Sequence, residues 1–261
     1  MKNNNVVLVT RPKKQASEFV SLLESKGLKS IVFPCIEIQQ VELSNSLKEK
    51  LQTLNDNDLI IFISANAVEK SAHLMQQLDI KPATITAEIA TIGKATYGAA
   101  ASLGFNITHS PESGFNSDAL LGLERFKSAN IKGSQCLIIR GVGGLEYLAD
   151  ELRGRSVKVD YAEVYRRNKP EVDENISREE LSNCWEELQI NAITVTSNES
   201  LQNLYDMLQE PGRKKMLATM LIVASPRAKE LAQRLGFKSV VLARSALNAH
   251  MLEAVENNRN N

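Results

Sequence analysis

Small polar residues follow most of the short apolar runs in this chain, and their types suit the binding of an anion. Ser, Thr and Asn at such positions cap the helix that follows, and the free N–H groups at a helix N-terminus attract negative charge. Arg11 and Arg140 end apolar runs, where they could bind carboxylates or form salt bridges at the rim of a sheet. The small residues concerned are Thr10, Ser64, Asn66, Gly93, Thr96, Gly141, Ser197, Asn198 and Ser225.

Motifs for metals, nucleotides and acyl transfer are missing from the sequence. The three cysteines are far apart and form no CxxC pair, which is typical of reduced thiols in a cytosolic protein, and the three histidines lack metal-ligand spacing. The run from Gly141 to Glu146 has no third glycine at the dinucleotide-binding spacing, and Gly93-Lys94 is not followed by Ser or Thr. No GxSxG nucleophile motif is present. We therefore expect neither a metal nor a nucleotide cofactor.

Composition excludes several classes of protein. Lys and Arg total 31 and Asp and Glu total 31, so the net charge is zero, which disfavours a strongly basic nucleic-acid binder. Aromatic residues make up only 5%, too few for a base-stacking surface. The N-terminal apolar run is too short for a signal peptide, and no stretch approaches the roughly 20 apolar residues that span a bilayer. We expect a soluble cytoplasmic protein.

The elements that position these residues alternate between strand and helix. The apolar runs are too short for buried helices, and most of them are followed by a segment with helical periodicity. Repetition of this unit predicts parallel sheets with crossover helices, whose turns meet at the carboxyl edge of the sheet. The predicted strands are residues 6–10, 31–33, 59–63, 89–92, 137–140, 193–196, 221–224 and 240–242.

The chain also repeats itself at a coarser level, which predicts two similar flavodoxin-like α/β domains. IFISANAVEKSAHL resembles ITVTSNESLQNLYDML, and IATIGKATYGAAASLGF resembles LIVASPRAKELAQRLGF. The alternating runs at 33–41 and 160–167 fit no compact unit, and we interpret them as linkers. Domain 1 would comprise 1–34 with 171–261, domain 2 would comprise 42–160, and 35–41 and 161–170 would join them. A ligand would then lie between the domains.

Six motifs, in this order, resemble those of the uroporphyrinogen-III synthase family: VLVTRP, IFISANAV, IATIGKAT, LIIRGVGG, VYRR and VASPRAKELAQRLGF. The resemblance spans nearly the whole chain. It implies a lyase without cofactor or metal that closes the linear tetrapyrrole hydroxymethylbilane to uroporphyrinogen III, with loss of water and inversion of ring D. It further implies a cytoplasmic enzyme of haem or sirohaem biosynthesis that binds its substrate between two α/β domains. We expect a monomer in transient contact with hydroxymethylbilane synthase, without nucleic-acid or membrane partners.

The resemblance also implies roles for individual residues. Tyr165 matches the family's VY motif, and its phenol could hydrogen-bond the departing hydroxyl, although a tyrosine there could simply pack against a domain. Thr96 matches the G-x-A-T turn, where it could instead bond its own backbone. Leu145 replaces an Arg of many bacterial members, and Arg227 replaces a small hydroxyl residue of some relatives. The expected substrate-binding residues are Arg11, Ser64, Asn66, Gly93, Thr96, Arg140, Gly141, Ser197, Asn198, Ser225 and Pro226.

Two other classes of function stay open. One is a non-catalytic two-domain protein that binds an anionic metabolite. The other is a regulatory interaction module built on flavodoxin-like domains. A receiver domain of that kind needs clustered acids at its strand ends, where this chain has Thr, Arg or Ser.

Overall fold

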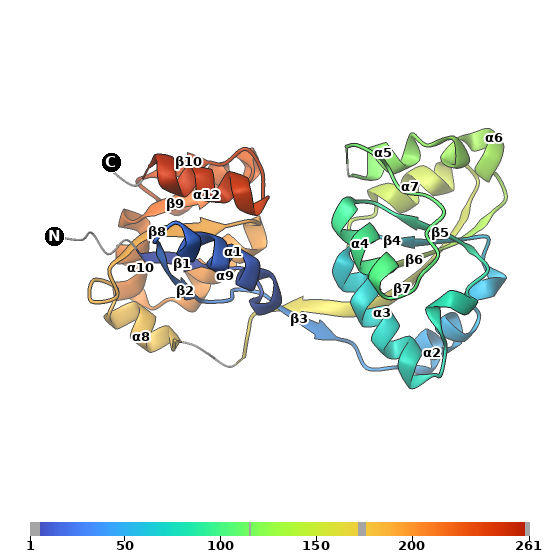
Figure 1. Cartoon of the computed structure of the whole chain (residues 1–261), viewed down its shortest axis with the longest axis horizontal. Coiled ribbons are helices and arrows are strands. Elements are labelled where there is room, and N and C mark those ends of the chain that lie inside the picture. The colour runs from blue at the N-terminus through green and yellow to red at the C-terminus, as the bar shows by residue number, and fades with distance from the viewer. Residues whose placement is uncertain (1–5, 115, 172–175, 259–261) are drawn as a thin grey trace. The chain divides into compact units, whose positions relative to one another are not determined.

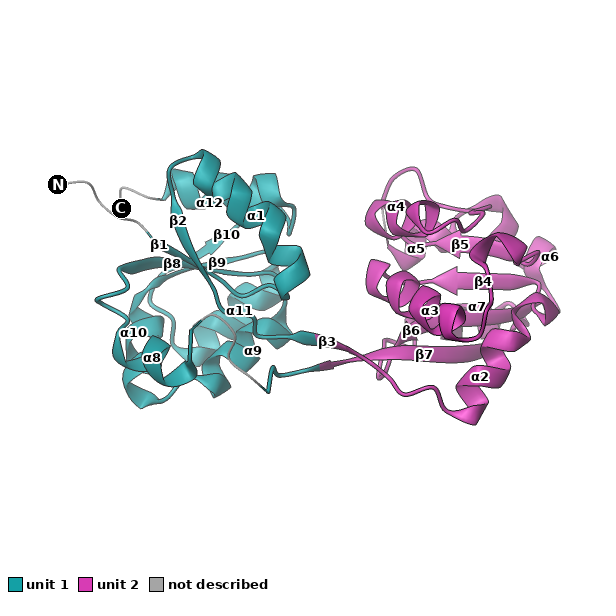
Figure 2. Cartoon of the chain, turned by 60° about the horizontal axis from the view of Figure 1, so that its bottom comes forward, with its two compact units in different colours: residues 1–37, 168–261 teal, residues 38–167 magenta. Residues whose placement is uncertain are grey.

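Two five-stranded sheets organise the chain, each built from short runs of Val, Ile and Leu that favour extended backbone. The computed structural model describes residues 6–114, 116–171 and 176–258. The chain divides into unit 1, residues 1–37 with 168–261, and unit 2, residues 38–167 (Figure 2). The first predicted strand, near residue 6, and the predicted strand near residue 59 lie in different sheets.

The sheet of unit 1 has the strand order β10-β9-β8-β1-β2, labelled in Figure 1. Taken in chain order this is the 2-1-3-4-5 arrangement of flavodoxin-like folds, and the strand pairings β1–β2, β1–β8, β8–β9 and β9–β10 are all parallel. The strands are β1 (Val6–Val9), β2 (Lys29–Val32), β8 (Ile190–Val195), β9 (Met220–Val223) and β10 (Val240–Leu242). The helices are α1 (Lys13–Ser25), α8 (Arg178–Asn183), α9 (Asn198–Met207), α10 (Glu210–Ala218), α11 (Pro226–Leu235) and α12 (Asn248–Asn257).

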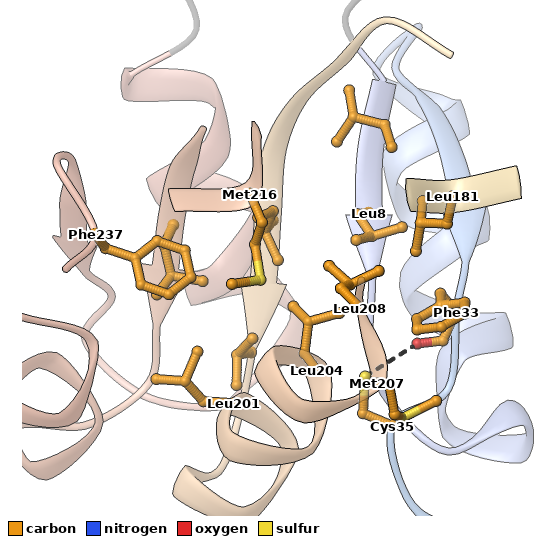
Figure 3. Close-up of a cluster of buried hydrophobic side chains, with 14 of the residues drawn as sticks. Leu8, Phe33, Cys35, Leu181, Leu201, Leu204, Met207, Leu208, Met216 and Phe237 are labelled. Atoms are coloured by element: carbon orange, nitrogen blue, oxygen red, sulfur yellow. Dashed lines mark hydrogen bonds between the residues drawn. The ribbon is translucent and has the colours of Figure 1, made fainter. Parts of the chain in front are cut away.

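Helices bury both faces of this sheet, which explains why β1 and β9 are apolar at every position. In β1, Val6 and Leu8 belong to the cluster under α8–α11, and Val7 and Val9 to the cluster under α1 and α12. Figure 3 shows part of the first cluster, in which Leu8 of β1 is joined by Leu181 of α8 and Leu204 of α9. In a strand with one solvent-exposed face, apolar and polar residues would alternate instead.

The sheet of unit 2 has the order β3-β7-β6-β4-β5. From β4 onward this repeats the 2-1-3-4 order, and β3 occupies the place that β10 holds in unit 1. The strands are β3 (Glu37–Gln40), β4 (Leu59–Phe62), β5 (Glu88–Thr91), β6 (Gln135–Gly141) and β7 (Lys158–Asn168). The helices are α2 (Asn45–Gln52), α3 (Ala65–Gln77), α4 (Lys94–Ser102), α5 (Ser117–Leu121), α6 (Ser128–Ile131) and α7 (Tyr147–Gly154), with 3₁₀ turns η1 (Leu54–Asp56), η2 (Pro82–Thr84) and η3 (Glu124–Phe126).

The predicted fold class, two similar α/β units, is confirmed: the sheet of unit 1 is parallel, and in unit 2 the pairings β4–β5, β4–β6 and β6–β7 are parallel. The two runs interpreted as linkers contain strands that neighbour each other in the sheet of unit 2. Residues 35–41 include β3, and β7 pairs with β6 from Lys158 to Tyr165. The alternation of apolar and polar residues in these runs is therefore that of sheet strands. Within the described ranges, no helix is long and apolar enough to cross a membrane.

Edge strand β5 begins at Glu88, whose carboxylate contacts one guanidinium and one imidazole. Its Oε2 lies 2.8 Å from Arg125 Nε and 2.6 Å from His109 Nε2. Burial raises the pKa of Glu88, but the hydrogen bonds from Arg125 and His109 outweigh it, so the pKa lies below its usual value. The ionised form of Glu88 therefore stabilises the fold.

We expect Glu88→Gln to lower the free energy of unfolding at pH 7 by about 0.2–1 kcal/mol, the usual range for partly exposed ion pairs. A folded-state pKa below the unfolded value of about 4.3 means that the contribution is present above that pH and is lost as the pH falls through the folded pKa. Urea unfolding from pH 7 to pH 3 should show the wild-type and variant curves converging in acid. Glu256→Gln, at an exposed position in α12, is the matched control. If wild type and Glu88→Gln still differed by the same unfolding free energy at pH 3, ionised Glu88 would not be the source of the stabilisation.

Candidate active site

Helix N-termini follow five of the parallel strands directly, and they carry most of the small residues predicted to form the site. A serine hydroxyl caps three of them by accepting the backbone N–H three residues ahead: Ser64 on α3, Ser197 on α9 and Ser225 on α11. Gly93 caps α4 and Pro12 precedes α1. These caps place backbone N–H donors at the carboxyl edge of each sheet.

Each unit has one topological switch point, where neighbouring strands send their crossovers in opposite directions. Open α/β sheets bind ligands at such points. In unit 1 the strands concerned are β1 and β8, followed by Arg11 and Ser197; in unit 2 they are β4 and β6, which lead to Ser64 and Gly141. The switch points thus select four of the predicted residues as the best placed.

Tyr165 lies at the switch point of unit 2 because β7 is bulged. Arg140 pairs with Glu163, but the next residue, Gly141, pairs with Tyr165, so that Val164 is an extra residue. Without the bulge, alternation would put Tyr165 on the same face as Glu163. Instead Tyr165 is buried in the same cluster as Val164, on the face covered by α3. Bulges re-aim side chains in this way beside functional sites.

The Tyr165 side chain is held by contacts with two other elements. Its hydroxyl lies 3.2 Å from Ser64 Oγ at the start of α3. Its ring lies over the backbone of Gly141, where a Cβ atom would be 2.7 Å from both Cε2 and Cζ. Only glycine fits at position 141 without movement of the ring. Only 4% of Tyr165 is exposed, so the ring is fixed while the hydroxyl lies beside a helix N-terminus.

The guanidinium of Arg140 has its hydrogen-bond and ion-pair partners within unit 2. Its Nη1 donates to Glu146 Oε1 at 2.7 Å, its Nη2 to Glu163 Oε1 at 3.2 Å, and its guanidinium carbon lies 3.7 Å from the ring centroid of Tyr161. Burial lowers the pKa of Arg140, but hydrogen bonds to Glu146 and Glu163 more than compensate, and the pKa is raised. Nη1 also bonds the carbonyl of Gly144, so Arg140 braces the loop after β6. The structure thus shows the salt-bridge alternative, and substrate binding by Arg140 stays a prediction.

Arg11 is tied to the segment before and at the start of α12. Its Nη1 donates to Asn248 Oδ1 and its Nη2 to the carbonyl of Ala246, both at 2.7 Å. Burial lowers the pKa of Arg11, and this effect outweighs the negative charge of Glu18, which raises it. The guanidinium lies over the ring of Phe19, and its buried Nε has no partner among the described residues. A carboxylate ligand would have to share this cation with Asn248.

The remaining predicted residues occupy first turns or strand ends. Thr96 is buried in the first turn of α4. Leu145 is 88% exposed in the loop after β6, and Arg227 is exposed at the start of α11. The half-exposed or exposed positions in first turns are Asn66 of α3, Asn198 of α9 and Pro226 of α11.

Two features of the site were missed from the sequence: the bulge and the pairing of Arg140 with Glu146 and Glu163. The bulge has only a weak signal: Val164 and Tyr165 are consecutive apolar residues, but so are Tyr161 and Ala162, where the register is regular. The ion pairs of Arg140 have no signal in the sequence, because Arg140 and Glu163 are brought together only by the register between β6 and β7. Within the described part of the chain, no group of three His, Cys, Asp or Glu residues is placed to hold a metal ion.

Unit 2 also has an open groove of about 820 Å³, which Tyr165 does not line. It runs beside β3, β7 and the first turns of α2, and its lining includes Gln40, Lys50, Asp160 and Arg166. None of the predicted site residues lines it. The groove is therefore not the anion site expected at the switch point.

Comparison with known proteins connects this geometry to one family. The family model described as "Uroporphyrinogen-III synthase HemD" matches residues 17–253. The uroporphyrinogen-III synthase of Salmonella typhimurium is 32% identical over 252 residues, covering 96% of this chain and 99% of the relative. That of Escherichia coli is 31% identical over 251 residues, with the same coverage.

Solved structures share the fold. The uroporphyrinogen-III synthetase of Helicobacter pylori has a TM-score of 0.60 at 14% identity, covering 97% of this chain and 99% of the other. A mutant uroporphyrinogen III synthase of Thermus thermophilus has a TM-score of 0.59 at 13% identity, covering 97% and 98%. The fold is therefore shared with proteins that are only 13–14% identical in sequence.

We expect Gly141→Ala to destabilise unit 2 by about 1–3 kcal/mol, because the added methyl overlaps the Tyr165 ring. Urea unfolding measures the loss. Gly154→Ala is the matched control, because a Cβ there meets nothing within 4 Å and alanine favours the helix. In a Tyr165→Ala background the Gly141→Ala change should lose most of its effect. Equal destabilisation in both backgrounds would show that the strain lies in the backbone.

Proposed function

Since the chain belongs to the uroporphyrinogen-III synthase family, we propose that Tyr165 supports the family's ring closure by donating a hydrogen bond to the departing hydroxyl. The reaction predicted from the motifs is confirmed by the family model and by relatives that match over almost their whole length. The enzyme is a cyclising lyase that converts hydroxymethylbilane to uroporphyrinogen III. None of these findings favours a non-catalytic binding protein.

The chemistry requires a proton donor at one point only. Ring A loses its hydroxyl as water, which leaves an electrophilic azafulvene. Ring D attacks this centre through its substituted carbon, and the resulting spiro intermediate fragments and recloses with ring D inverted. The proton taken up by the leaving hydroxyl is balanced by the proton lost when the closed ring regains its pyrrole form. Control of geometry is the main catalytic term, because the unassisted closure gives isomer I.

The observation that carries the role of Tyr165 is its fixed hydroxyl at a switch point. The ring is buried against Gly141, so it cannot swing away, and the hydroxyl lies 3.2 Å from a side chain at a helix N-terminus. A phenol held in this way can donate a hydrogen bond without first losing rotational freedom. The same helix N-terminus favours any negative charge that develops on the phenolic oxygen.

We propose that backbone N–H groups, more than cationic side chains, bind the eight carboxylates of the substrate. Arg11 and Arg140 already have polar partners in the structure. The capped N-termini of α3, α4, α9 and α11 keep N–H donors at the strand ends. The predicted residues that lie at these N-termini and take this role are Asn66, Gly93, Ser197, Asn198, Ser225 and Pro226.

The domain assignment and the surroundings of the enzyme stay proposals. We propose that residues 1–34 with 171–261 and residues 42–160 act as two domains. We further propose a monomer working in the cytoplasm and meeting hydroxymethylbilane synthase transiently. The reactivity of the bilane, which closes unaided to the wrong isomer, favours such a direct transfer.

We expect Tyr165→Phe to slow formation of uroporphyrinogen III by about 10²-fold, the lower end of the usual range for loss of a general acid. The electron-rich pyrrole already activates the leaving group, which limits the effect. Isomer III should remain the main enzymatic product, because the folded geometry selects the isomer. A quenched assay on freshly made hydroxymethylbilane, with separation of isomers I and III, measures both quantities.

Tyr161→Phe is the matched control for this experiment. Tyr161 lies on the same strand, but its hydroxyl bonds Glu146 and Arg153 instead of Ser64. Its loss should leave the rate of isomer III formation unchanged. A wild-type rate for Tyr165→Phe would remove Tyr165 from the mechanism. Isomer I formed faster than the spontaneous background would show that the phenol directs ring D.

A further inference from the structure

Ser64 lies between the backbone of α3 and the hydroxyl of Tyr165, and we propose that it is a positioning residue that points the Tyr165 proton toward the substrate. The proposal rests on the proposed role of Tyr165 in catalysis. It changes the role predicted for Ser64 from the sequence, which was direct binding of a substrate carboxylate. The observation that supports the proposal is that Ser64 Oγ makes two contacts, one with the Ala67 N–H and one with the Tyr165 hydroxyl.

Ser64 Oγ accepts a hydrogen bond from the backbone N–H of Ala67 at 3.1 Å and lies 3.2 Å from Tyr165 Oη. A hydroxyl has one proton to donate and two lone pairs. The Ala67 N–H can only donate, so it occupies one lone pair of Ser64. The proton of Ser64 is then free to be donated to Tyr165 Oη, which leaves the phenolic proton unused within the protein.

Either direction of this bond leaves one proton without an acceptor among the described residues, so the choice of Ser64 as the donor rests on the proposed role of Tyr165, whose proton then goes to the substrate. The arrangement in which Ser64 donates forms a continuous series from Ala67 N–H through Ser64 to Tyr165. Hydrogen bonds in series polarise one another, and the positive end of α3 strengthens Ser64 as a donor.

The equivalent cap in the other unit shows that this contact is not a general property of the repeat. Ser197 occupies the matching position before α9, and its Oγ lies 2.9 Å from Ser200 Oγ within the same helix. In α3 the corresponding residue is Ala67, which has no hydroxyl. The Ser64 proton is therefore available for a residue on another strand, and the bulge in β7 places Tyr165 there.

Ser64→Gly tests the proposal, because glycine is nearly as good an N-cap as serine but has no hydroxyl. We expect kcat for isomer III formation to fall about 3–10-fold, the equivalent of one ordinary hydrogen bond, with KM unchanged. Ser64→Thr keeps the hydroxyl and should restore kcat. Ser44→Gly, at the cap of α2, is the matched control, since Ser44 accepts the Leu47 N–H in the same way and should leave both constants unchanged.

Combination with Tyr165→Phe separates this proposal from the role of Tyr165 itself. The Tyr165→Phe variant has no phenolic hydroxyl to orient, so Ser64→Gly should have no further effect on kcat in that background. An equal fall in both backgrounds would overturn the proposal, as would a raised KM with unchanged kcat, which would return Ser64 to carboxylate binding. Tyr165→Phe alone at the wild-type rate would instead refute the proposed function.

Discussion

Parallel pairing between strands that are far apart in sequence is the constraint on which the rest of the structure depends. In unit 1, β1 pairs with β8, and two buried threonines join these strands across the sheet: Thr10 Oγ1 donates to the carbonyl of Thr194, and Thr194 Oγ1 to that of Leu8. Parallel neighbours cannot be joined by a tight turn, so each must be followed by a crossover, usually a helix. Helix N-termini therefore collect at one edge of each sheet. The backbone N–H donors at that edge therefore follow from topology before any side chain is chosen.

The catalytic proposal depends on a local departure from this regularity. Tyr165 comes within reach of Ser64 only because one extra residue in β7 turns its side chain to the other face. The residue pair directly before the bulge is Arg140 and Glu163, which are joined by hydrogen bonds on the face opposite Tyr165. The same strand ends thus carry a paired charge on one face and a phenol on the other. Gly141 serves both, because it lets the ring approach and continues into the loop that Arg140 braces.

The sequence allowed the fold class, the crossovers and most strand positions to be predicted, because these depend on local apolar runs such as Ile60–Phe62 and on capping residues such as Ser225. It did not reveal that β3 occupies the edge of the second sheet. Its four residues, EIQQ, have only one strongly apolar side chain, and its place depends on β7. The bulge and the partners of Arg140 were also missed, since both depend on register between β6 and β7. Local pattern carries no information about register between strands separated by a helix.

The division of unit 1 between the two ends of the chain has a consequence for its synthesis. β1 is an interior strand of its sheet, with β2 on one side and β8 on the other. At about 5–20 residues per second, β8 leaves the ribosome roughly 10–30 s after β2. During that interval the whole of unit 2 is available to fold, whereas β1, entirely apolar from Val6 to Val9, has one edge without its partner. During synthesis, one edge of the apolar strand β1 therefore stays unpaired while unit 2 can already fold. Pairing of that edge has to wait until β8, in the last third of the polypeptide, has been synthesised.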